Sequence, residues 1–140
     1  MNILPSEKST QRNGPKTLVL VVDDDTKILN FIRVSLKLAG YDVVTATAGE
    51  ESLKLVDSEK PGIMLLDIVM CPMDGFEVIK RLRTFSRMPV IAISAHASAA
   101  EKALSLGADD FLGKPFRPDD LLKKIKTLLE YRSNQSNAVE

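Results

Sequence analysis

Cysteine and tryptophan are almost missing from this 140-residue chain, which has one Cys, no Trp, two Tyr and five Phe. A single cysteine excludes an internal disulfide and fits a reducing compartment, so we expect a cytoplasmic protein. The chain has 19 Lys and Arg against 19 Asp and Glu, a balance that disfavours non-specific binding to nucleic acid. No apolar run reaches transmembrane length, and the first residues lack the apolar core of a signal peptide. We therefore expect neither a membrane segment nor direct nucleic-acid binding.

The most informative stretch is an apolar run that leads directly into three carboxylates. Residues 18–22 are apolar and mostly β-branched, and Asp23, Asp24 and Asp25 follow them. A continuous apolar run of this length is typical of a strand buried on both faces, as in a parallel sheet covered by helices. Such sheets carry their chemistry at the carboxyl ends of the strands. Adjacent acids there repel one another unless a cation or hydrogen-bond donors compensate. The alternative is a polar turn in which Asp25 caps the next helix.

Three further apolar runs lead into residues with polar side chains, which are Asp67, Ser94 and Lys114. Because parallel strands end at the same edge of a sheet, Asp67 is expected near Asp23 and Asp24. Carboxylate oxygens are hard ligands that suit Mg²⁺. A hydroxyl donor and an ammonium group beside them suit a phosphoryl group. The sequence therefore predicts a site that binds a divalent metal and a phosphoryl group.

Strand and helix patterns alternate five times along the chain, and 44% of its residues are hydrophobic, enough for one domain with a core. The expected strands are 17–22, 41–46, 63–66, 90–93 and 111–112, and the expected helices are 26–39, 48–58, 75–85, a short one ending at 106, and 118–132. This alternation predicts an α/β fold with a parallel sheet and right-handed crossovers.

Several helix ends carry sequence signals. Gly40 is expected to end the first helix in a left-handed conformation. Three later segments have the spacing of a capping box, in which side chains at both ends of the first turn bond the backbone. They are Thr47 to Glu50, Asp74 to Glu77 and Ser98 to Glu101.

The chain resembles the receiver domain of two-component response regulators, of the CheY-like superfamily. The likeness covers about residues 16–132 and depends on an ordered set of motifs: Val21-Val22-Asp23-Asp24, Leu65-Leu66-Asp67-Ile68-Val69-Met70, Met73-Asp74-Gly75, Ile93-Ser94-Ala95, Gly107-Ala108-Asp109-Asp110 and Lys114-Pro115-Phe116. It implies a flavodoxin-like, doubly wound sheet of five parallel strands in the order 2-1-3-4-5 with five helices. Residues 1–15 are then expected to be a mobile arm, and 133–140 a polar tail or the start of a linker.

The resemblance also implies a phosphorylation-controlled switch of a two-component or phosphorelay system rather than an enzyme with a separate substrate. Asp67 would accept a phosphoryl group from a histidine kinase or histidine phosphotransfer protein. Asp23, Asp24, Asp67 and the backbone carbonyl of Val69 would hold Mg²⁺, for which Mn²⁺ could substitute. Lys114 would pair with a phosphoryl oxygen.

Four side chains are expected to shape the response. The resemblance makes Ser94 the switch hydroxyl and Phe111 the aromatic residue that turns inward with it. Phe111 lacks the hydroxyl that would favour an outward rotamer, and the alternative is an ordinary core phenylalanine. Val69 and His96 are placed to shield the phosphate or to orient water, which would set the phosphate lifetime. The alternative for His96 is a solvated loop residue.

The chain departs from the family pattern in the loop after Asp67, in the segment after Ser94, and at Arg117, which precedes Pro118 where a capping acid or hydroxyl is expected. Cys71 stands where the family usually has proline, and Pro72 follows it. Cys71 is either a small apolar filler or a redox-sensitive thiol. The segment from Ser94 to Gly107 is about two residues shorter than usual. A phosphorylation-dependent dimer is compatible with the resemblance, but the short segment weakens inferences about partners.

Two other classes of function compete with the switch. An aspartate-nucleophile phosphatase would need a second acid two residues after Asp67, where Val69 stands. A phosphate-independent interaction module would not need the complete set of acids, hydroxyl and lysine. The sequence does not identify the kinase or the downstream target.

Overall fold

The computed structural model describes residues 16–138, in which strands and helices alternate as expected. The strands are β1 (Leu18–Val22), β2 (Asp42–Ala46), β3 (Ile63–Asp67), β4 (Val90–Ser94) and β5 (Asp110–Gly113). The helices are α2 (Thr26–Leu38), α3 (Gly49–Glu59), α4 (Gly75–Leu82), α5 (Ala99–Leu106) and α6 (Pro118–Ala138). The mobile arm expected at residues 1–15 lies outside the described residues, as do residues 139–140.

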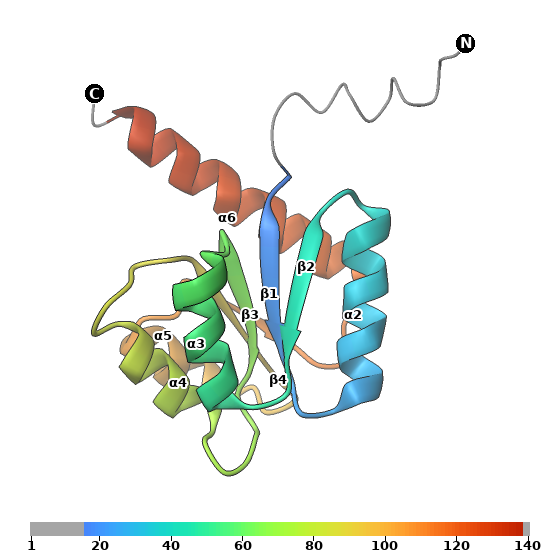
Figure 1. Ribbon diagram of the computed structural model, residues 1–140, viewed down its shortest axis with the longest axis vertical. Helices are drawn as coiled ribbons and strands as arrows, with labels where there is room; N and C mark the ends of the chain where they lie inside the picture. The colour runs from blue at the N-terminus through green and yellow to red at the C-terminus, as the bar shows by residue number, and fades with distance from the viewer. Residues whose placement is uncertain (1–15, 139–140) are drawn as a thin grey trace.

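The strands form one parallel sheet in the order β2-β1-β3-β4-β5. This is the flavodoxin-like, doubly wound order that the resemblance implied. The chain enters at β1, adds β2 on one side of it and then returns to build β3, β4 and β5 on the other. All carboxyl ends therefore meet at one end of the sheet, at the bottom of Figure 1, where the light-green loop after β3 protrudes.

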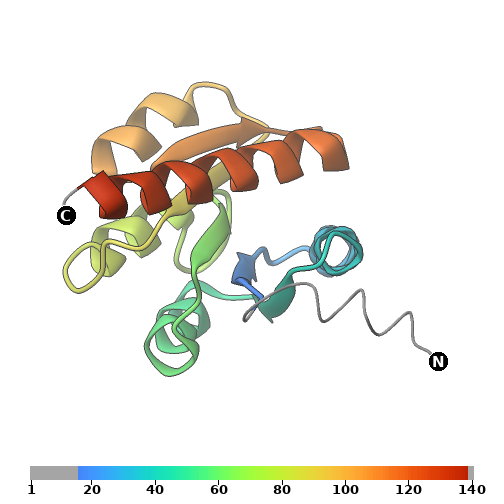
Figure 2. The same cartoon turned by 90° about the horizontal axis from the view of Figure 1, so that it is seen from above.

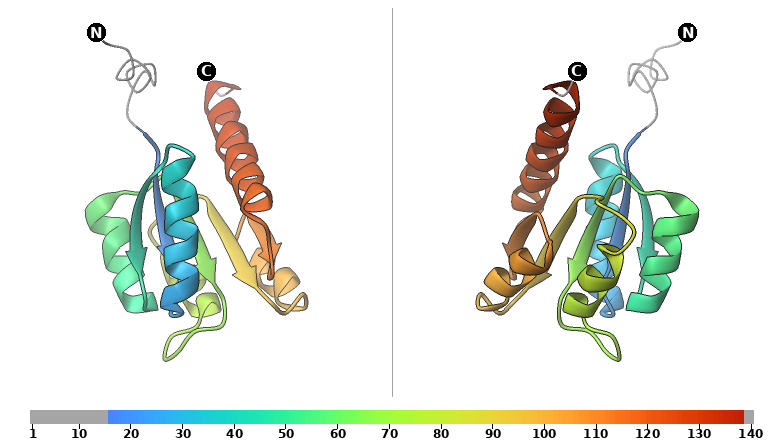
Figure 3. Two further views of the ribbon diagram at one scale, coloured as in Figure 1. Left: turned by 90° about the vertical axis from the view of Figure 1, so that its right-hand side faces the viewer. Right: turned by 90° about the vertical axis from the view of Figure 1, so that its left-hand side faces the viewer.

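Alternate side chains of the buried strands supply two apolar clusters, one on each face of the sheet. Leu20 and Leu66 belong to the cluster covered by α3, α4 and α5. Val21 and Leu65 belong to the cluster covered by α2 and α6. Figure 2 shows these layers from above, and Figure 3 shows them from both sides. Because neighbouring residues face opposite clusters, β1 and residues 63–66 and 90–93 of β3 and β4 are apolar throughout, as their sequences indicated.

Three of the expected helix-end signals are confirmed. The Asp25 carboxylate caps α2 by accepting hydrogen bonds from the backbone N–H groups of Lys27 and Ile28. Gly40 has a φ angle of +97°, which a residue with a side chain rarely adopts, and it lies just past the end of α2. Asp74 caps α4 by accepting from the N–H of Glu77 at 3.0 Å, but only this half of the predicted capping box forms, because the Glu77 carboxylate pairs with Arg81 at 2.9 Å.

The capping boxes predicted for α3 and α5 are wrong. α3 starts one residue later than predicted, so Glu51 rather than Glu50 reaches back to the Thr47 N–H, at 3.0 Å. Its cap residue, Ala48, has no side-chain oxygen that could accept a hydrogen bond. Ser98 already has helical backbone angles, φ −66° and ψ −15°, and makes no capping hydrogen bond. An N-cap side chain reaches the first turn from extended backbone, which Ser98 lacks.

Two helices also differ in length from the prediction. α4 ends at Leu82 rather than at Phe85, because the chain tightens there: the N–H groups of Thr84 and Phe85 bond carbonyls only three residues back. α6 continues past Arg132, its predicted end, to Ala138. No Gly or Pro interrupts this polar last part. Among residues 16–138, no helix has the length and hydropathy needed to span a bilayer.

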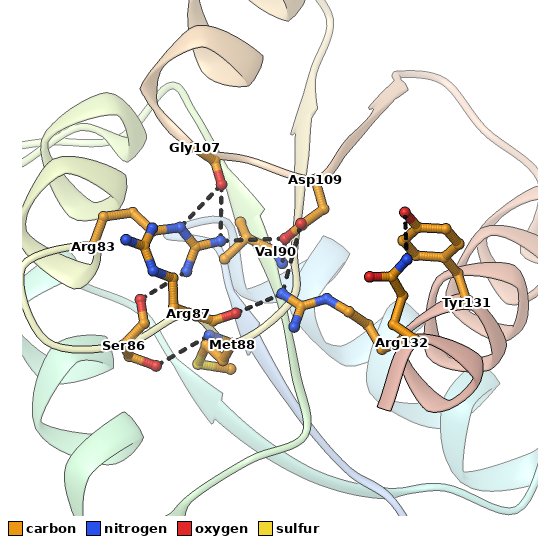
Figure 4. A network of polar contacts seen from close by, with 10 residues as sticks. Arg83, Ser86, Arg87, Met88, Val90, Gly107, Asp109, Tyr131 and Arg132 are labelled. Carbon is orange, nitrogen blue, oxygen red and sulfur yellow. Dashed lines mark hydrogen bonds and ion pairs between the residues drawn. The ribbon is translucent and has the colours of Figure 1, made fainter. Parts of the chain in front are cut away.

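A polar network around Asp109 joins the amino-terminal end of β4 to α4 and α6 (Figure 4). The Asp109 carboxylate accepts from the Val90 N–H at 2.8 Å and pairs with Arg83 at 3.2 Å and Arg132 at 3.7 Å. The Arg83 guanidinium also donates to the carbonyl oxygen of Gly107 at 2.8 and 3.0 Å. These contacts anchor the end of the sheet farthest from the carboxyl ends of the strands.

Candidate functional site

Strand pairing brings the predicted site residues to one edge of the sheet. Asp67, the last residue of β3, is the register partner of Ile93 in β4. Ser94, the next residue of β4, is the partner of Gly113 in β5. The Lys114 N–H then donates to the Ser94 carbonyl oxygen at 2.9 Å, one residue past β5. A carboxylate, a hydroxyl and an ammonium group therefore follow one another across neighbouring strands.

The Lys114 ammonium group lies between two buried carboxylates. Its Nζ is 3.1 Å from Asp67 Oδ1 and 3.4 Å from Asp23 Oδ2. Asp23 and Asp67 are only 3% and 5% exposed, so the carboxylate partners of these ion pairs are largely shielded from water. The other Asp23 oxygen, Oδ1, accepts from the Asp25 N–H at 2.9 Å. These contacts fix Asp23 from two sides and direct Lys114 toward Asp67.

The electrostatic environment makes Asp67 unusually basic for an aspartate. Burial raises its pKa to about 6 from an ordinary 3.8, and the nearby Asp23 and Asp24 carboxylates add to the rise. Hydrogen bonding and charge attraction from Lys114 only partly oppose this. Burial lowers the pKa of Lys114, but attraction to Asp23 and Asp67 outweighs burial and leaves it raised. Positive charge near Asp67 therefore stabilises its ionised carboxylate, and Lys114 is one fixed cation that supplies such charge.

Carboxylate oxygens of Asp23, Asp24 and Asp67 all lie within 4.8 Å of one another. Asp24 is exposed while the other two are buried, so the group is open to solvent on one side. An all-oxygen donor set with an open side fits Mg²⁺, which keeps several of its waters in protein sites. The chemistry of these residues therefore fits the metal that the resemblance implied.

An open cavity of about 260 Å³ lies over the acids, and Val69, His96 and Lys114 line it together with Asp67 and Asp23. Val69 is 58% exposed and His96 is also exposed. Both side chains that were expected to govern water access are thus at the mouth of the site.

The structure also defines the surroundings of three further residues. Ser94 is 1% exposed, and its Oγ accepts from the His96 N–H at 3.0 Å. Phe111 is half-buried and packs against the apolar cluster that contains Ala92. Cys71 is exposed on the loop after β3, so it is not a core filler.

The family model of the response regulator receiver domain matches residues 19–126. The chain belongs to the response regulator receiver domain family. It is 40% identical over 114 residues to the alkaline phosphatase synthesis transcriptional regulatory protein PhoP of Bacillus subtilis (strain 168). That match covers 79% of this chain and 48% of PhoP. The chain is also 38% identical over 112 residues to the transcriptional regulatory protein KdpE of Mycobacterium tuberculosis, covering 79% of this chain and 50% of KdpE. It thus spans about half the length of the curated relatives that it matches.

Solved receiver domains share both the fold and the extent of the described chain. A CheY-like response regulator receiver domain protein from Methanospirillum hungatei JF-1 superposes with a TM-score of 0.81 at 31% identity. The alignment covers 86% of this chain and 99% of that one. The receiver domain of the Francisella response regulator 1452 gives a TM-score of 0.78 at 33% identity, covering 84% and 99%. The chain is therefore a regulatory receiver domain of a two-component system.

Two residues that shape this receiver domain were not given a role by motif spacing. Gly75 packs against the backbone at the end of β3, and Asp109 joins the opposite end of the sheet to two helices. Both stand in motifs that carried the resemblance. Their contacts are tertiary, so no local pattern in the sequence could assign them.

Asp24→Asn should raise the dissociation constant for Mg²⁺ more than Asp23→Asn does. Both Asp23 oxygens already bond protein groups, Asp25 and Lys114, whereas Asp24 is exposed at the open side of the cluster. Direct metal ligation would therefore depend more on Asp24. Calorimetric titration of both variants measures the difference, and equal losses would mean that the two acids share the role.

Without metal, Asp24→Asn should also raise Tm, because it neutralises one of three crowded anions; a clear fall in Tm would contradict this.

Proposed function

We propose that this receiver domain takes a phosphoryl group onto Asp67 from a phosphohistidine of a histidine kinase or histidine phosphotransfer protein. The observation that carries the proposal is the buried Asp67 carboxylate, 3.1 Å from the Lys114 ammonium and beside two further acids. A cation and a potential metal site next to a buried nucleophile are what phosphoryl transfer requires, because that reaction depends on positioning and charge neutralisation.

The transfer would proceed in one displacement at phosphorus. An Asp67 oxygen attacks the phosphorus atom, the P–N bond of the phosphohistidine breaks, and the bonding electrons leave with the imidazole nitrogen. The product is an acyl phosphate on Asp67. Because the pKa of Asp67 is raised to about 6, its carboxylate is mostly ionised, and able to attack, above that pH. Lys114 would then exchange its pairing with the carboxylate for pairing with a phosphoryl oxygen.

Asp23, Asp24, Asp67 and the backbone carbonyl of Val69 would hold Mg²⁺, or Mn²⁺ with its similar preference for oxygen ligands. When bound, the ion neutralises negative charge on the acceptor and on the phosphoryl oxygens. The contribution of the protein is to keep these carboxylates together despite their repulsion. Lys114 supports that arrangement by pairing with Asp23 and Asp67.

Ser94 and Phe111 would pass the change to the rest of the domain. The Ser94 oxygen accepts from the His96 N–H, so its own proton can be donated to a phosphoryl oxygen. That new bond would draw the end of β4 and the loop after it toward Asp67. Phe111 is the register partner of Ala92, two residues before Ser94, and is only half-buried. It is therefore in a position to change its packing when the end of β4 moves.

An apolar surface beside the site supports contact with a protein phosphodonor. Ile28 and Phe31 of α2, with Pro115 and Phe116 after Lys114, border a hollow of about 320 Å³. Phe31 is 47% exposed. Large apolar side chains left in water next to a reactive group are typical of a surface that a partner covers.

The curated relatives are named as transcriptional regulators, so control of transcription is the output that the similarity favours. The matched part is only about half of each relative. We propose that residues 16–138 contribute the phosphorylation switch in the cytoplasm and do not themselves bind DNA, in keeping with a chain of zero net charge.

Incubation with acetyl phosphate and Mg²⁺, followed by intact-mass measurement, tests the proposal. We expect an adduct of one phosphoryl group per chain that hydroxylamine removes, as it removes an acyl phosphate. Rapid consumption of acetyl phosphate without an adduct would instead indicate a phosphatase. If the protein forms no adduct and does not consume acetyl phosphate, the result would indicate an interaction module. Each of these two alternative results would overturn the proposed switch.

The phosphorylated protein should lose its phosphate slowly, and Val69→Asn should accelerate the loss. An apolar, β-branched side chain at the mouth of the site shields the phosphate and cannot orient water, whereas an asparagine can. His96→Ala should also change the decay rate, because the exposed His96 side chain lines the mouth of the site, where it can orient water or exclude it. Decay is measured at saturating Mg²⁺. The control is Val34→Asn, which makes the same substitution at an exposed valine of α2. A decay rate that is unchanged in His96→Ala would leave His96 as a solvated loop residue.

A further inference from the structure

Gly75 connects the start of α4 to the residues that follow the acceptor. It is buried, and it is the first residue of α4 after the capping Asp74. Its N–H donates to the Ile68 carbonyl oxygen at 2.8 Å. The Ile68 N–H in turn donates to the Ile93 carbonyl oxygen at 3.0 Å. Ile68 is therefore held on both sides, by β4 through its N–H and by Gly75 through its carbonyl.

A side chain at Gly75 would collide with the backbone of the acceptor strand. A Cβ atom there would lie 2.7 Å from the Asp67 carbonyl oxygen and 2.7 Å from Ile68 Cα. Contacts under 3.0 Å are essentially never made by real Cβ atoms, and backbone atoms cannot move aside as a flexible side chain can. Gly62, at the other end of β3, differs in this respect. Its nearest neighbour would be a side-chain methyl, Thr17 Cγ2, at 3.1 Å.

We propose that Gly75 is a positioning residue of the phosphoryl-transfer site: by having no side chain, it lets α4 rest on the backbone of Asp67 and Ile68 and so sets where the acceptor and the Val69 backbone lie. The inference rests on the function proposed above. The geometric reason is that peptide groups are planar. Because the Ile68 carbonyl is fixed by Gly75, the plane that it shares with the Val69 N–H is fixed as well.

The position of the Val69 backbone matters because its carbonyl and the Asp67 carboxylate would both bind the metal. Sites of this kind tolerate errors of only about 0.5 Å, and a displacement of about 1 Å can cost roughly 100-fold in rate. A methyl group at Gly75 must displace α4 or the strand end by an amount of this order to relieve contacts of 2.7 Å. Such a shift would weaken Mg²⁺ binding and slow phosphoryl transfer.

The test compares Gly75→Ala with Gly62→Ala, which adds the same methyl group at the opposite end of the same strand. Mg²⁺ affinity is measured by calorimetric titration, and the phosphorylation rate with acetyl phosphate by intact mass, at a temperature where both variants are folded. We expect Gly75→Ala to lower both roughly 10- to 100-fold. Gly62→Ala should change the Mg²⁺ affinity and the phosphorylation rate by less than about threefold, even if its Tm falls as much as that of Gly75→Ala.

Equal Mg²⁺ affinities in the two variants would overturn the proposal. The double variant Ile68→Val/Gly75→Ala removes the side-chain Cδ1 atom that also crowds the added methyl, at 2.8 Å, but leaves the backbone contacts. Recovery of Mg²⁺ affinity in the double variant would likewise overturn it, because side-chain crowding would then explain the loss. If wild-type protein binds Mg²⁺ but takes up no phosphate, the proposed function fails while the Mg²⁺ comparison still decides the role of Gly75.

If Gly75→Ala does not fold, Asp74→Ala tests the same contact from the other side. It removes the cap that holds the first turn of α4 and adds no atom near the strand. A fall in Mg²⁺ affinity in the folded variant supports the proposal. Unchanged affinity, with α4 loosened, overturns it.

Discussion

Asp67→Asn should abolish phosphorylation by acetyl phosphate while the domain remains folded. An amide of nearly the same volume replaces the carboxylate, so the buried space at the end of β3 stays filled. An amide oxygen is a poor nucleophile and lacks the charge that draws Lys114 and a metal ion to the site. The expected loss is complete within detection by intact mass after incubation with excess donor and Mg²⁺.

Asp57→Asn is the matched control, since Asp57 is an exposed aspartate of α3 whose only ion pair within residues 16–138 is a 4.0 Å contact with Lys60. It should be phosphorylated at the wild-type rate. If Asp67→Asn still gains a phosphoryl group, peptide mapping decides the interpretation. Label on Asp23, Asp24 or Ser94 would mean that neighbouring groups can replace the acceptor, and equal uptake by both variants would show that Asp67 is not the acceptor.

The second large effect concerns stability: without metal, Asp67→Asn should unfold less readily than wild type at neutral pH. The native pKa of Asp67 is raised to about 6, against 3.8 for an ordinary aspartate. At about 1.4 kcal/mol for each tenfold change, ionising this buried carboxyl removes up to roughly 3 kcal/mol from the free energy of unfolding. Asparagine carries no charge and avoids that loss.

The sign of the pH dependence follows from the raised native pKa. Between about pH 4 and 6 the native state binds a proton at Asp67 that the unfolded state has already released, so wild-type stability falls as pH rises through this window. The advantage of Asp67→Asn should therefore be full above about pH 6 and vanish below about pH 4. Urea unfolding in EDTA across this range measures it. An advantage that stays constant with pH would mean that Asp67 titrates normally in the folded protein. Saturating Mg²⁺ should reduce the advantage, because the ion stabilises the ionised wild-type site.

The sequence was sufficient to predict the strands and which side chains gather at the candidate site, because both depend on local patterns. Apolar runs such as residues 63–66 are typical of doubly buried strands, and the residue that ends such a run lies at the sheet edge. For this reason the amino-acid pattern alone predicts that Asp67 and Lys114 lie at the same edge, and their side chains are in fact 3.1 Å apart. The strand order could not be predicted from local patterns. Periodicity allows several orders, and only the resemblance selected 2-1-3-4-5, which the structure has.

Features that depend on long-range contacts or on one-residue shifts could not be predicted. The predicted cap of α3 was wrong because the helix starts one residue later than predicted, which makes the Glu51 carboxylate the bonding partner of the Thr47 N–H. The early end of α4 accompanies bonds from Arg83 to Gly107, 24 residues away along the chain. Likewise, the raised pKa of Asp67 depends on how deeply β3 ends inside the domain, which composition alone does not state.

The network around Asp109 has a consequence for how the chain folds. Its bonds join Arg83 to Asp109 across 26 residues and Arg132 to Arg87 across 45. Closing such long loops costs entropy before the contacts return any stability, so we expect these bonds to form late in folding. The network around Asp109 is complete only when α6 docks and brings Arg132 to Asp109 and to the Arg87 carbonyl oxygen. The part of the domain from α4 to α6 should therefore gain and lose its protection against hydrogen exchange as one cooperative unit, rather than helix by helix.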